Sequence, residues 1–203
     1  MYKMFFKRFL DIVFSLLGLI VSLPINIIVA IIIKLTSEGP VIFKQERIGK
    51  DGKVFWMYKF RTMKVNAEHT GSGVYSGKDD PRVTKIGKIL RATSIDEFPQ
   101  FLNILKGDMS FIGPRPVLTY HPWTYDKYTE EQLKRFRVRP GITGWAQVNG
   151  RKQVIWEERI VKDCYYVDNL SLFLDIKIIF MTIIQVLKNE NNVNTIVTVK
   201  EEK

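Results

Sequence analysis

The chain has 203 residues, which allows one ordinary domain with a hydrophobic core and excludes two domains of the usual size. Lys and Arg outnumber Asp and Glu by 31 to 21, so the net charge of +10 predicts anionic partners: nucleic acid, an anionic membrane surface or a phosphorylated small molecule. The single cysteine, Cys164, excludes an intramolecular disulfide and a multi-thiolate metal site.

An uncharged, mostly apolar segment covers residues 12–33. A helix of that length would measure about 33 Å, which is just enough to cross a bilayer. Pro24 lies inside the segment, removes a helical N–H donor and disfavours the helical conformation at Leu23. We therefore expect two shorter helices that meet at a break.

Basic residues flank this segment on both sides, and a spanning helix would leave one basic flank outside the cytoplasm, against the positive-inside tendency. They are Lys3, Lys7 and Arg8 before it, and Lys34, Lys44, Arg47, Lys50 and Lys53 after it. A re-entrant hairpin broken at Pro24 keeps both flanks in the cytoplasm, provided that polar groups satisfy the freed backbone. We predict this hairpin for residues 1–36. A plain transmembrane anchor is the alternative, and the lack of a small-residue cleavage site argues against a signal peptide.

Apolar and polar residues alternate within 41–60, which predicts a β-hairpin. In it, 41–48 pairs with 54–60 around the turn at 49–52. A Gly- and Ser-rich stretch at 70–77 is typical of a mobile loop. A short basic helix is expected at 83–91. Apolar residues at helical spacing then predict a second helix over 98–105, which Gly107 ends.

The remainder predicts two loops, at 113–116 and 140–145, and helices at 130–136 and 172–187. The last of these helices is mostly apolar and suits a membrane interface or the core. The expected fold class is α/β: a small mixed domain with a β-hairpin and several helices, anchored by the membrane hairpin and interfacial helices. The expected division is a membrane hairpin at 1–36, a catalytic domain at 37–190 and a polar tail at 191–203.

Two adjacent carboxylates, Asp96 and Glu97, stand at the expected start of the 98–105 helix. In a helix they point about 100° apart, so they suit separate tasks: one attacks phosphorus while the other holds a divalent cation. The positive end of the helix dipole favours both an ionised carboxylate and a bound phosphate. The alternative is structural, because Ser94-x-x-Glu97 matches a capping box and Asp96 could itself be an N-cap.

Four arginines stand in predicted turns or at helix ends: Arg61, Arg91, Arg115 and Arg151. Arginine binds phosphate oxygens through two parallel hydrogen bonds, and neighbouring Pro or Gly residues fix its approach. Each could be a solvated surface charge by itself. Four together predict a diphosphate site.

Other partners of a basic protein are less well supported. Nucleic-acid binding would require basic residues interleaved with exposed aromatic ones or placed on a recognition helix, and the sequence has no zinc spacing and no RNA-binding signature, so we expect no nucleic-acid partner. His69 and His121 form no metal motif, and no phosphate-binding glycine loop occurs.

Five motifs resemble those of the bacterial sugar transferases known as monotopic phosphoglycosyl transferases, in the minimal single-domain type. They are KQERIG at 44–49, YKFRTM at 58–63, TSIDEFPQ at 93–100, GPRP at 113–116 and PGITGWAQVNGR at 140–151. Their order and spacing match from about residue 5 to residue 188. Family members often have Ser-Pro at the membrane break, where this chain has Leu23-Pro24, and Ser22 is the nearest hydroxyl.

The resemblance implies a two-step reaction that depends on Mg²⁺. Asp96 would attack the β-phosphate of a UDP-sugar and release UMP, and polyprenol (undecaprenyl) phosphate would then accept the phosphosugar. Glu97 would share the metal or handle a proton. The enzyme would work among membrane lipids at the cytoplasmic face of the bacterial plasma (inner) membrane and start the assembly of a glycan.

The resemblance also implies which residues bind the nucleotide and its phosphates. Arg91, Arg115 and Arg151 match positions that hold phosphate, and Asp163 matches a recurring acidic position. We assign Lys59, Arg61 and Gln147, which lie inside matched motifs, to the same group. Two other hypotheses stay open: a membrane-bound phosphohydrolase with water as acceptor, and a basic membrane-surface binding module. The sequence carries no signature of the donor sugar, the glycan pathway or the oligomeric state.

Overall fold

The computed structural model describes residues 2–70, 80–150 and 155–187. One long helix, α1 (Lys7–Thr36), runs along one side of a mixed α/β body, and a π-helical turn (Tyr2–Phe6) precedes it. The body contains two small sheets and shorter helices, so the expected α/β class with a β-hairpin is confirmed. The expected loop at 70–77 lies almost wholly outside the described residues, as does the polar tail at 191–203.

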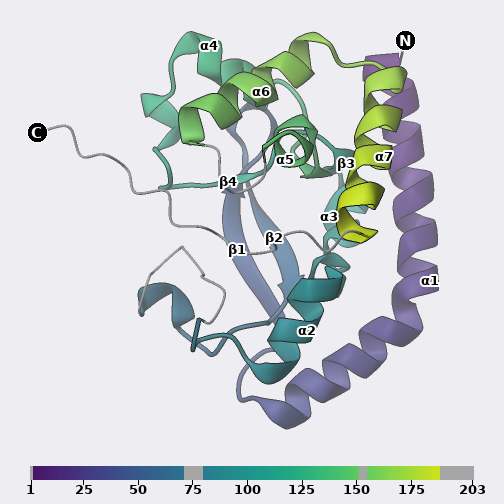
Figure 1. Ribbon diagram of the computed structural model, residues 1–203, viewed down its shortest axis with the longest axis vertical. Coiled ribbons are helices and arrows are strands. Elements are labelled where there is room, and N and C mark those ends of the chain that lie inside the picture. Colours follow the sequence, from purple (N-terminus) through teal and green to yellow (C-terminus); the bar gives the residue numbers. More distant parts are fainter. Residues whose placement is uncertain (1, 71–79, 151–154, 188–203) are drawn as a thin grey trace, which may run out of the picture.

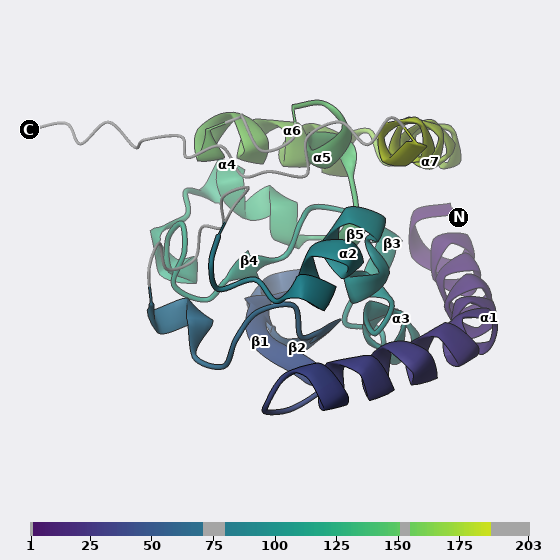
Figure 2. The ribbon, with the colours of Figure 1, turned by 60° about the horizontal axis from the view of Figure 1, so that its bottom comes forward.

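Helix α1 contains Pro24 and is continuous, and it bends sharply partway along its length (Figures 1 and 2). The expectation of two separate helices was therefore wrong. A proline inside a helix removes one hydrogen bond and is a usual cause of a bend of this kind, so the chain can bend without ending the helix. Polar groups do occur beside Pro24: Asn26 Nδ2 donates to Ser22 Oγ at 3.0 Å, and Ser22 Oγ lies 3.5 Å from the Leu19 carbonyl.

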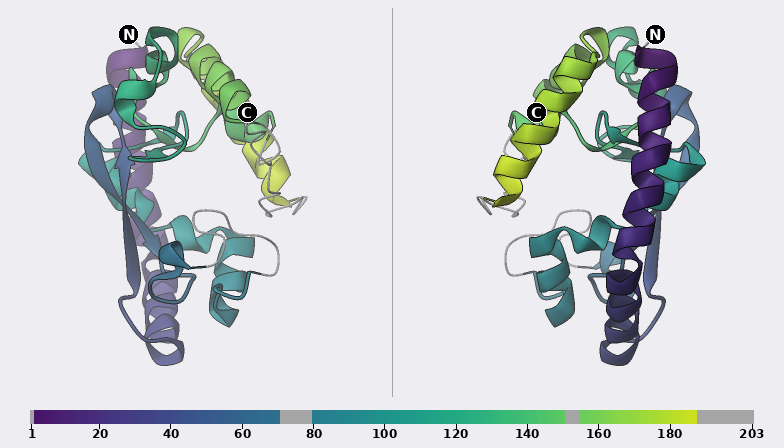
Figure 3. Two further views of the ribbon diagram at one scale, coloured as in Figure 1. Left: turned by 90° about the vertical axis from the view of Figure 1, so that its left-hand side faces the viewer. Right: turned by 90° about the vertical axis from the view of Figure 1, so that its right-hand side faces the viewer.

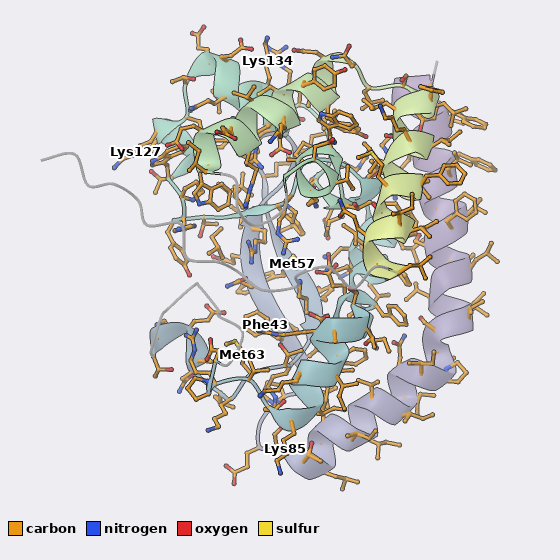
Figure 4. All side chains as sticks on the ribbon, in the orientation of Figure 1. Phe43, Met57, Met63, Lys85, Lys127 and Lys134 are labelled. Carbon is orange, nitrogen blue, oxygen red and sulfur yellow. The ribbon has the colours of Figure 1, made fainter. Side chains whose placement is uncertain are left out.

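The length and composition of α1 would allow it to cross a membrane, and only 17% of its most apolar 18-residue window is buried. Most of its outward side chains are hydrocarbon (Figure 4). The same is true of α7 (Leu172–Leu187), and the presence of this helix confirms the one expected at 172–187. A buried core helix would not expose such a surface to water. Helix α1 is thus a candidate membrane anchor. The exposed apolar residues of the two helices include Phe14, Ile20, Val21, Leu23, Ile28, Ile31, Phe173, Phe180, Ile184 and Leu187.

The predicted hairpin is present as β1 (Ile42–Ile48) and β2 (Val54–Phe60), antiparallel with Ile48 opposite Val54. A third strand, β4 (Val117–Leu118), extends the sheet on the far side of β1 and was not expected. The side chains of Phe55 and Met57 point to one face of β2, where they pack against Ile104 of α3 (Gln100–Lys106). Figure 4 places Met57 in the middle of the molecule.

A second sheet pairs β3 (Ser110–Ile112) with β5 (Gly141–Thr143) in parallel. Residues 140–145 were expected to form a loop, and a strand of three residues is too short to show an alternating pattern. Backbones cross closely here: a Cβ on Gly144 would lie 2.0 Å from the Gly113 carbonyl oxygen, and one on Gly141 would lie 2.1 Å from the Gly113 nitrogen. Glycine is required at these positions because there is no room for a side chain.

Buried carboxylates fasten the start of α1 to the body. Asp175 of α7 accepts hydrogen bonds from Tyr2 at 2.5 Å, Lys7 at 2.7 Å and Tyr166 at 2.7 Å. Asp11 of α1 accepts from Ser110 Oγ at 3.0 Å and from the Phe111 N–H at 3.1 Å. Figure 3 shows α1 and α7 diverging from this end of the molecule. The ends of the two most apolar helices are therefore joined through polar contacts.

The other expected helices are present with shifted ends: α2 (Lys85–Thr93), α3, and α4 (Glu130–Leu133) followed by a 3₁₀ turn (Lys134–Phe136). Gly107 ends α3 in the left-handed conformation (φ 96°), as predicted. Two helices were not assigned from the sequence, α5 (Trp145–Val148) and α6 (Trp156–Asp168). Figure 4 shows Lys127 and Lys134 at the end of the molecule that carries α4, opposite Lys85 at the start of α2.

Candidate functional site

The acidic pair lies in a single 3₁₀ turn (Ile95–Glu97) between α2 and α3. Ser94 separates this turn from α2 and adopts the left-handed conformation (φ 58°, ψ 15°), which costs a residue other than glycine about 1–2 kcal/mol. This conformation ends α2 and reverses the chain, so that the Asp96 turn packs on both α2 and β2. Such local strain is common where a functional group is held in place.

The capping alternative is wrong for this turn. The Ser94 side chain makes no capping hydrogen bond, since a residue in the left-handed conformation does not have the extended backbone of an N-cap. The carboxylate of Glu97 pairs with Lys59 and not with the backbone of Ser94. Helix α3 begins only at Gln100, after Pro99. Asp96 and Glu97 therefore stand before the helix, with carboxylates that are not used as caps.

Strand β2 supplies the lysine of the site. Because side chains alternate along a strand, Lys59 shares the face of Phe55 and Met57, which α3 covers. Its ammonium consequently reaches the turn before α3, where Nζ lies 2.6 Å from Glu97 Oε1. The pair is largely buried, with 18% and 23% of the two side chains exposed.

The two carboxyl groups have opposite electrostatic environments. Burial raises the pKa of Asp96, which is 8% exposed, and the charges of Lys59 and Arg91 offset only part of this. Burial would also raise the pKa of Glu97, but the charges of Lys59 and Arg115 outweigh it, so that the pKa of Glu97 is lowered. Neighbouring acids with pKa values pushed apart are typical of sites with two distinct roles.

Two of the predicted arginines lie around this pair. Arg91, in the last turn of α2, donates through Nε to Thr62 Oγ1 at 2.9 Å, and its charge acts on Asp96. Arg115 lies in the loop between β3 and β4 with an exposed side chain, and its charge acts on Glu97. The structure thus brings Lys59, Arg91 and Arg115 together with the two acids. Their assignment as substrate ligands stays a prediction.

Arg47 is a further cation at this site, and from the sequence it was expected only as part of the basic flank of the apolar segment. It stands opposite Phe55 in the β1–β2 register and so shares the face that carries Lys59. Its guanidinium donates to the Pro116 carbonyl at 3.0 Å and to Gln45, and its charge interacts with those of Arg115 and Glu97. The predicted hairpin could have indicated this role for Arg47, because the alternation of side chains puts Arg47 and Lys59 on the same face of it.

Two other predicted residues have different surroundings. Arg61 is buried and donates to the carbonyls of Ser37 and Glu38, where α1 ends, so its guanidinium is occupied by that helix terminus. Gln147 of α5 donates through Nε2 to the Ile142 carbonyl at 3.1 Å. These contacts hold the backbone of the protein and lend no support to a phosphate-binding role for either residue.

Asp163 was predicted to bind substrate, but it is 1% exposed and pairs with Arg135, which is 2% exposed. Arg135 Nη2 lies 2.7 Å from Asp163 Oδ2 and also donates to the Arg115 carbonyl at 3.0 Å. Burial raises the pKa of Asp163, and the Arg135 charge opposes this. The structure therefore places Asp163 behind the site, linked to Arg115 through Arg135. Arg151 lies outside the described residues.

Asp96 and Glu97 have the oxygen ligands that a magnesium ion prefers. Mg²⁺ commonly takes only one or two protein carboxylates and completes its octahedron with water and substrate phosphates. Among the residues that the structure describes, no group of three or more His, Cys, Asp or Glu could hold a metal ion by itself. Two adjacent carboxylates, Asp96 and Glu97, fit a metal that arrives with a diphosphate.

The fold and the site together place a buried acidic pair and several cations in a body that carries a candidate membrane-anchor helix. A family model described as bacterial sugar transferase matches residues 2–189, which is most of the chain. The chain belongs to this family. The resemblance seen in the five sequence motifs is thereby confirmed.

Three similar proteins have informative names. The chain is 45% identical over 188 residues to the uncharacterized sugar transferase EpsL of Bacillus subtilis, covering 92% of this chain and 90% of EpsL. It is 46% identical over 186 residues to a UDP-glucose:undecaprenyl-phosphate glucose-1-phosphate transferase of Klebsiella pneumoniae, covering 89% of this chain and 40% of that protein. It is 43% identical over 182 residues to a UDP-N-acetylgalactosamine-undecaprenyl-phosphate N-acetylgalactosaminephosphotransferase of Aeromonas hydrophila, covering 88% and 43%. The chain therefore spans nearly all of EpsL and about two fifths of the other two.

Proposed function

We propose that this protein transfers a phosphosugar from a UDP-sugar to undecaprenyl phosphate and releases UMP, as the first membrane step of polysaccharide assembly. The observation that carries the proposal is the placement of Asp96, buried in a turn between Lys59 and Arg91, in a chain that belongs to the sugar transferase family. The names of two relatives support this reaction and differ in the sugar, so the proposal commits to a UDP-sugar and not to one sugar.

In the first step, a carboxylate oxygen of Asp96 attacks the β-phosphorus of the UDP-sugar. An aspartyl–phosphorus bond forms, the bond from the β-phosphorus to the bridging oxygen breaks, and UMP leaves with the bonding electrons. In the second step, a phosphate oxygen of undecaprenyl phosphate attacks the same phosphorus and frees the Asp96 carboxylate. The raised pKa of Asp96 supports a nucleophilic role, because a more basic carboxylate is a better nucleophile.

The residues around Asp96 supply binding and charge. Arg91 and Arg115 would hold the diphosphate oxygens, as arginine forks commonly do. Lys59 keeps Glu97 ionised through their 2.6 Å contact. Asp96 and Glu97 would also hold Mg²⁺, which when bound supplies positive charge that offsets the negative charge of the diphosphate.

The membrane topology belongs to the same proposal. Helix α1 enters the cytoplasmic leaflet of the bacterial inner membrane, bends, and returns, while the apolar face of α7 rests at the interface. The bend of α1 and the basic residues on both flanks support this arrangement (Figures 1 and 2). It would bring the acidic pair to the level of the lipid headgroups, where the acceptor phosphate lies.

The reaction is tested with purified full-length protein in detergent or nanodiscs, Mg²⁺, undecaprenyl phosphate and a panel of UDP-sugars. UMP release that requires undecaprenyl phosphate supports the transferase, and sustained release without it would establish the phosphohydrolase instead. We expect Asp96→Asn to lower kcat on the order of 10³-fold or more. The exposed Asp126→Asn serves as the matched control and should keep full activity.

The covalent step needs its own measurement. A UDP-sugar labelled at the β-phosphate, given without undecaprenyl phosphate, should label the parent protein and not Asp96→Asn. The label should then leave the protein on addition of undecaprenyl phosphate. Full turnover by Asp96→Asn would rule out the covalent role of Asp96.

The topology is tested with single cysteines in Cys164→Ser, placed at Phe5 and Leu35, at the two ends of α1. Both positions are exposed in the structure. A membrane-impermeant thiol reagent should label both from the cytoplasmic side only. Labelling of position 5 from the periplasmic side alone would establish a spanning helix.

A further inference from the structure

The loop at 113–116 is held from outside at three successive carbonyls. The Pro114 carbonyl accepts from the Gly141 N–H at 2.9 Å, the Arg115 carbonyl from Arg135 at 3.0 Å, and the Pro116 carbonyl from Arg47 at 3.0 Å. Two of the four loop residues are prolines and have no N–H to donate, and the Gly113 N–H donates to the Thr143 carbonyl at 2.9 Å, so the loop has few donors of its own for these carbonyls. The position of the loop therefore depends on three donors that are distant in the sequence.

Arg135 is the more deeply buried of the two arginines that hold the loop. It is 2% exposed, and both its Nε and Nη2 donate to Asp163 Oδ2, at 3.2 and 2.7 Å. Its guanidinium also lies 5.0 Å from the ring centroid of Phe136. A guanidinium held by helix α6 and by an aromatic ring has little freedom to move.

A buried ion pair is by itself a poor way to stabilise a fold. The cost of removing two charges from water often exceeds their attraction, and well-packed apolar replacements are commonly neutral or stabilising. The Arg135–Asp163 pair does something that an apolar pair could not do, because Arg135 donates to the Arg115 carbonyl. The neighbouring Arg115 side chain is exposed and acts electrostatically on Glu97.

We infer that Arg135 is a positioning residue for the transfer reaction. Asp163 fixes Arg135, Arg135 fixes the backbone of Arg115 through its carbonyl, and the Arg115 guanidinium is thereby held beside the acidic pair. Arg47 supports the next carbonyl in the same way. The inference rests on the proposed function for its catalytic consequence, and on the hydrogen bonds alone for its structural one.

The test uses Arg135→Met/Asp163→Leu, which replaces the pair by apolar residues of similar size and removes the donor to the Arg115 carbonyl. We expect the variant to remain folded, with a thermal unfolding midpoint close to that of the parent. Its kcat should fall about 10–100-fold, because a displacement of about 1 Å can cost about 100-fold in rate. The KM for the UDP-sugar should rise as well, because the displaced Arg115 would hold the diphosphate oxygens less well.

A double-mutant cycle separates positioning from a general loss of structure. If Arg135 acts through Arg115, the apolar pair should cost little further activity in an Arg115→Met background. Additive losses, or full activity of the folded apolar-pair variant, would overturn the inference. If that variant does not fold, Asp163→Asn takes its place, with a smaller loss and the same lack of additivity.

Hydrogen–deuterium exchange gives a readout that does not depend on activity. Peptides that cover 113–118 should exchange faster in the apolar-pair variant, and those that cover β2 should not. Arg139→Met is the matched control, because Arg139 donates to a different loop carbonyl, that of Gly107, at 2.7 Å. The Arg139→Met protein should have the same activity as the parent and the same exchange rate at 113–118.

The two proposals can fail separately. A parent protein that releases no UMP with any UDP-sugar would contradict the proposed function, and faster exchange at 113–118 would still support the positioning of Arg115. An active parent whose exchange at 113–118 does not respond to loss of Arg135 would contradict the positioning role alone.

Discussion

Lys59 Nζ lies 2.6 Å from Glu97 Oε1, and this contact joins β2 to the turn that carries both acids. The charge of this lysine also opposes, more than any other cation does, the rise that burial causes in the pKa of Asp96. One side chain therefore acts on the pKa of both carboxylates, and its charge favours the ionised form of each. Loss of this lysine leaves the Glu97 carboxylate, which is 23% exposed, without its ion-pair partner beside Asp96.

We predict that Lys59→Met lowers kcat/KM by about 10–100-fold, since hydrogen bonds to charged groups contribute about 1.5–3 kcal/mol. Steady-state UMP release measures the effect. Lys106→Met is the control, because Lys106 is exposed and contacts Tyr58 on the neighbouring position of β2. Equal activity of the two variants would show that the Lys59–Glu97 pair has no part in the reaction.

Asp175 is expected to be a major determinant of stability. It is 2% exposed and accepts hydrogen bonds from Tyr2, Lys7 and Tyr166, so its loss leaves buried donors unpaired. We predict that Asp175→Asn destabilises the protein by about 3 kcal/mol, or about 6–12 °C in the thermal midpoint.

The control for this change is Asp168→Asn. The Asp168 side chain is 52% exposed and lies 3.8 Å from Lys134, and exposed ion pairs contribute little. Differential scanning fluorimetry in detergent should show a large shift for Asp175→Asn and almost none for Asp168→Asn. Similar shifts for both would mean that the polar junction of α1 and α7 is dispensable.

Gly144→Ala should be among the most damaging single-methyl changes in the chain. Its Cβ would lie 2.0 Å from the Gly113 carbonyl oxygen, and neither backbone can move without separating β3 from β5. We expect a loss of about 3 kcal/mol or more, at the upper end of overpacking effects.

Gly18→Ala makes a useful comparison, because its Cβ would meet the ring of Phe101 at 2.9 Å. A side-chain ring can shift, and alanine favours the helix, so we expect a change within about 1 kcal/mol. The thermal unfolding midpoints of Gly144→Ala and Gly18→Ala, measured in the same buffer, test this difference in stability. A Gly144→Ala protein as stable as Gly18→Ala would contradict the close backbone approach.

The folded protein should become less stable as the pH is lowered, because His121 binds a proton less readily when folded. Burial lowers the pKa of His121, and the charges of Arg47 and Arg159 lower it further. The unfolded chain, in which the usual pKa of about 6.5 applies, then binds the proton more readily than the folded protein. Stability is therefore full above about pH 6.5 and decreases as the pH falls toward the folded-state pKa.

We predict that His121→Gln reduces this loss. Thermal midpoints of the parent and the variant at pH 7.5, 6.5 and 5.5 measure the effect, and the two curves should diverge below pH 6.5. Parallel curves would exclude His121 as the titrating group. The ring of His121 also packs edge-on against Trp156, at 5.5 Å between centroids, so a constant offset between the curves would reflect packing alone.

Local patterns predicted the parts of the fold that depend on local interactions. The hairpin of β1 and β2, the helix end at Gly107 and the apolar helix over 172–187 all follow from residues near one another in sequence. The parallel pair of β3 and β5 brings Ser110 opposite Gly141, and such short, distant segments carry no periodic signal.

The candidate site was predictable in its residues and not in all of their contacts. Asp96, Glu97, Lys59, Arg91 and Arg115 were named from the motifs, and the structure brings them together. Burial of charge is decided by the tertiary structure, and therefore the sequence could not show that Asp163 faces Arg135 in the interior. It could not show either that the end of α1 occupies Arg61.

The bracing of the loop at 113–116 has a consequence for protein engineering. The loop is held by Gly141, Arg135 and Arg47, which belong to three other segments of the chain. A chimera that exchanges only the four loop residues with those of another sugar transferase would import a sequence without its supports. The smallest transplantable unit is the loop together with these three residues and Asp163. Libraries that aim at new donor sugars should vary neighbouring surface positions and leave the loop and these four residues unchanged.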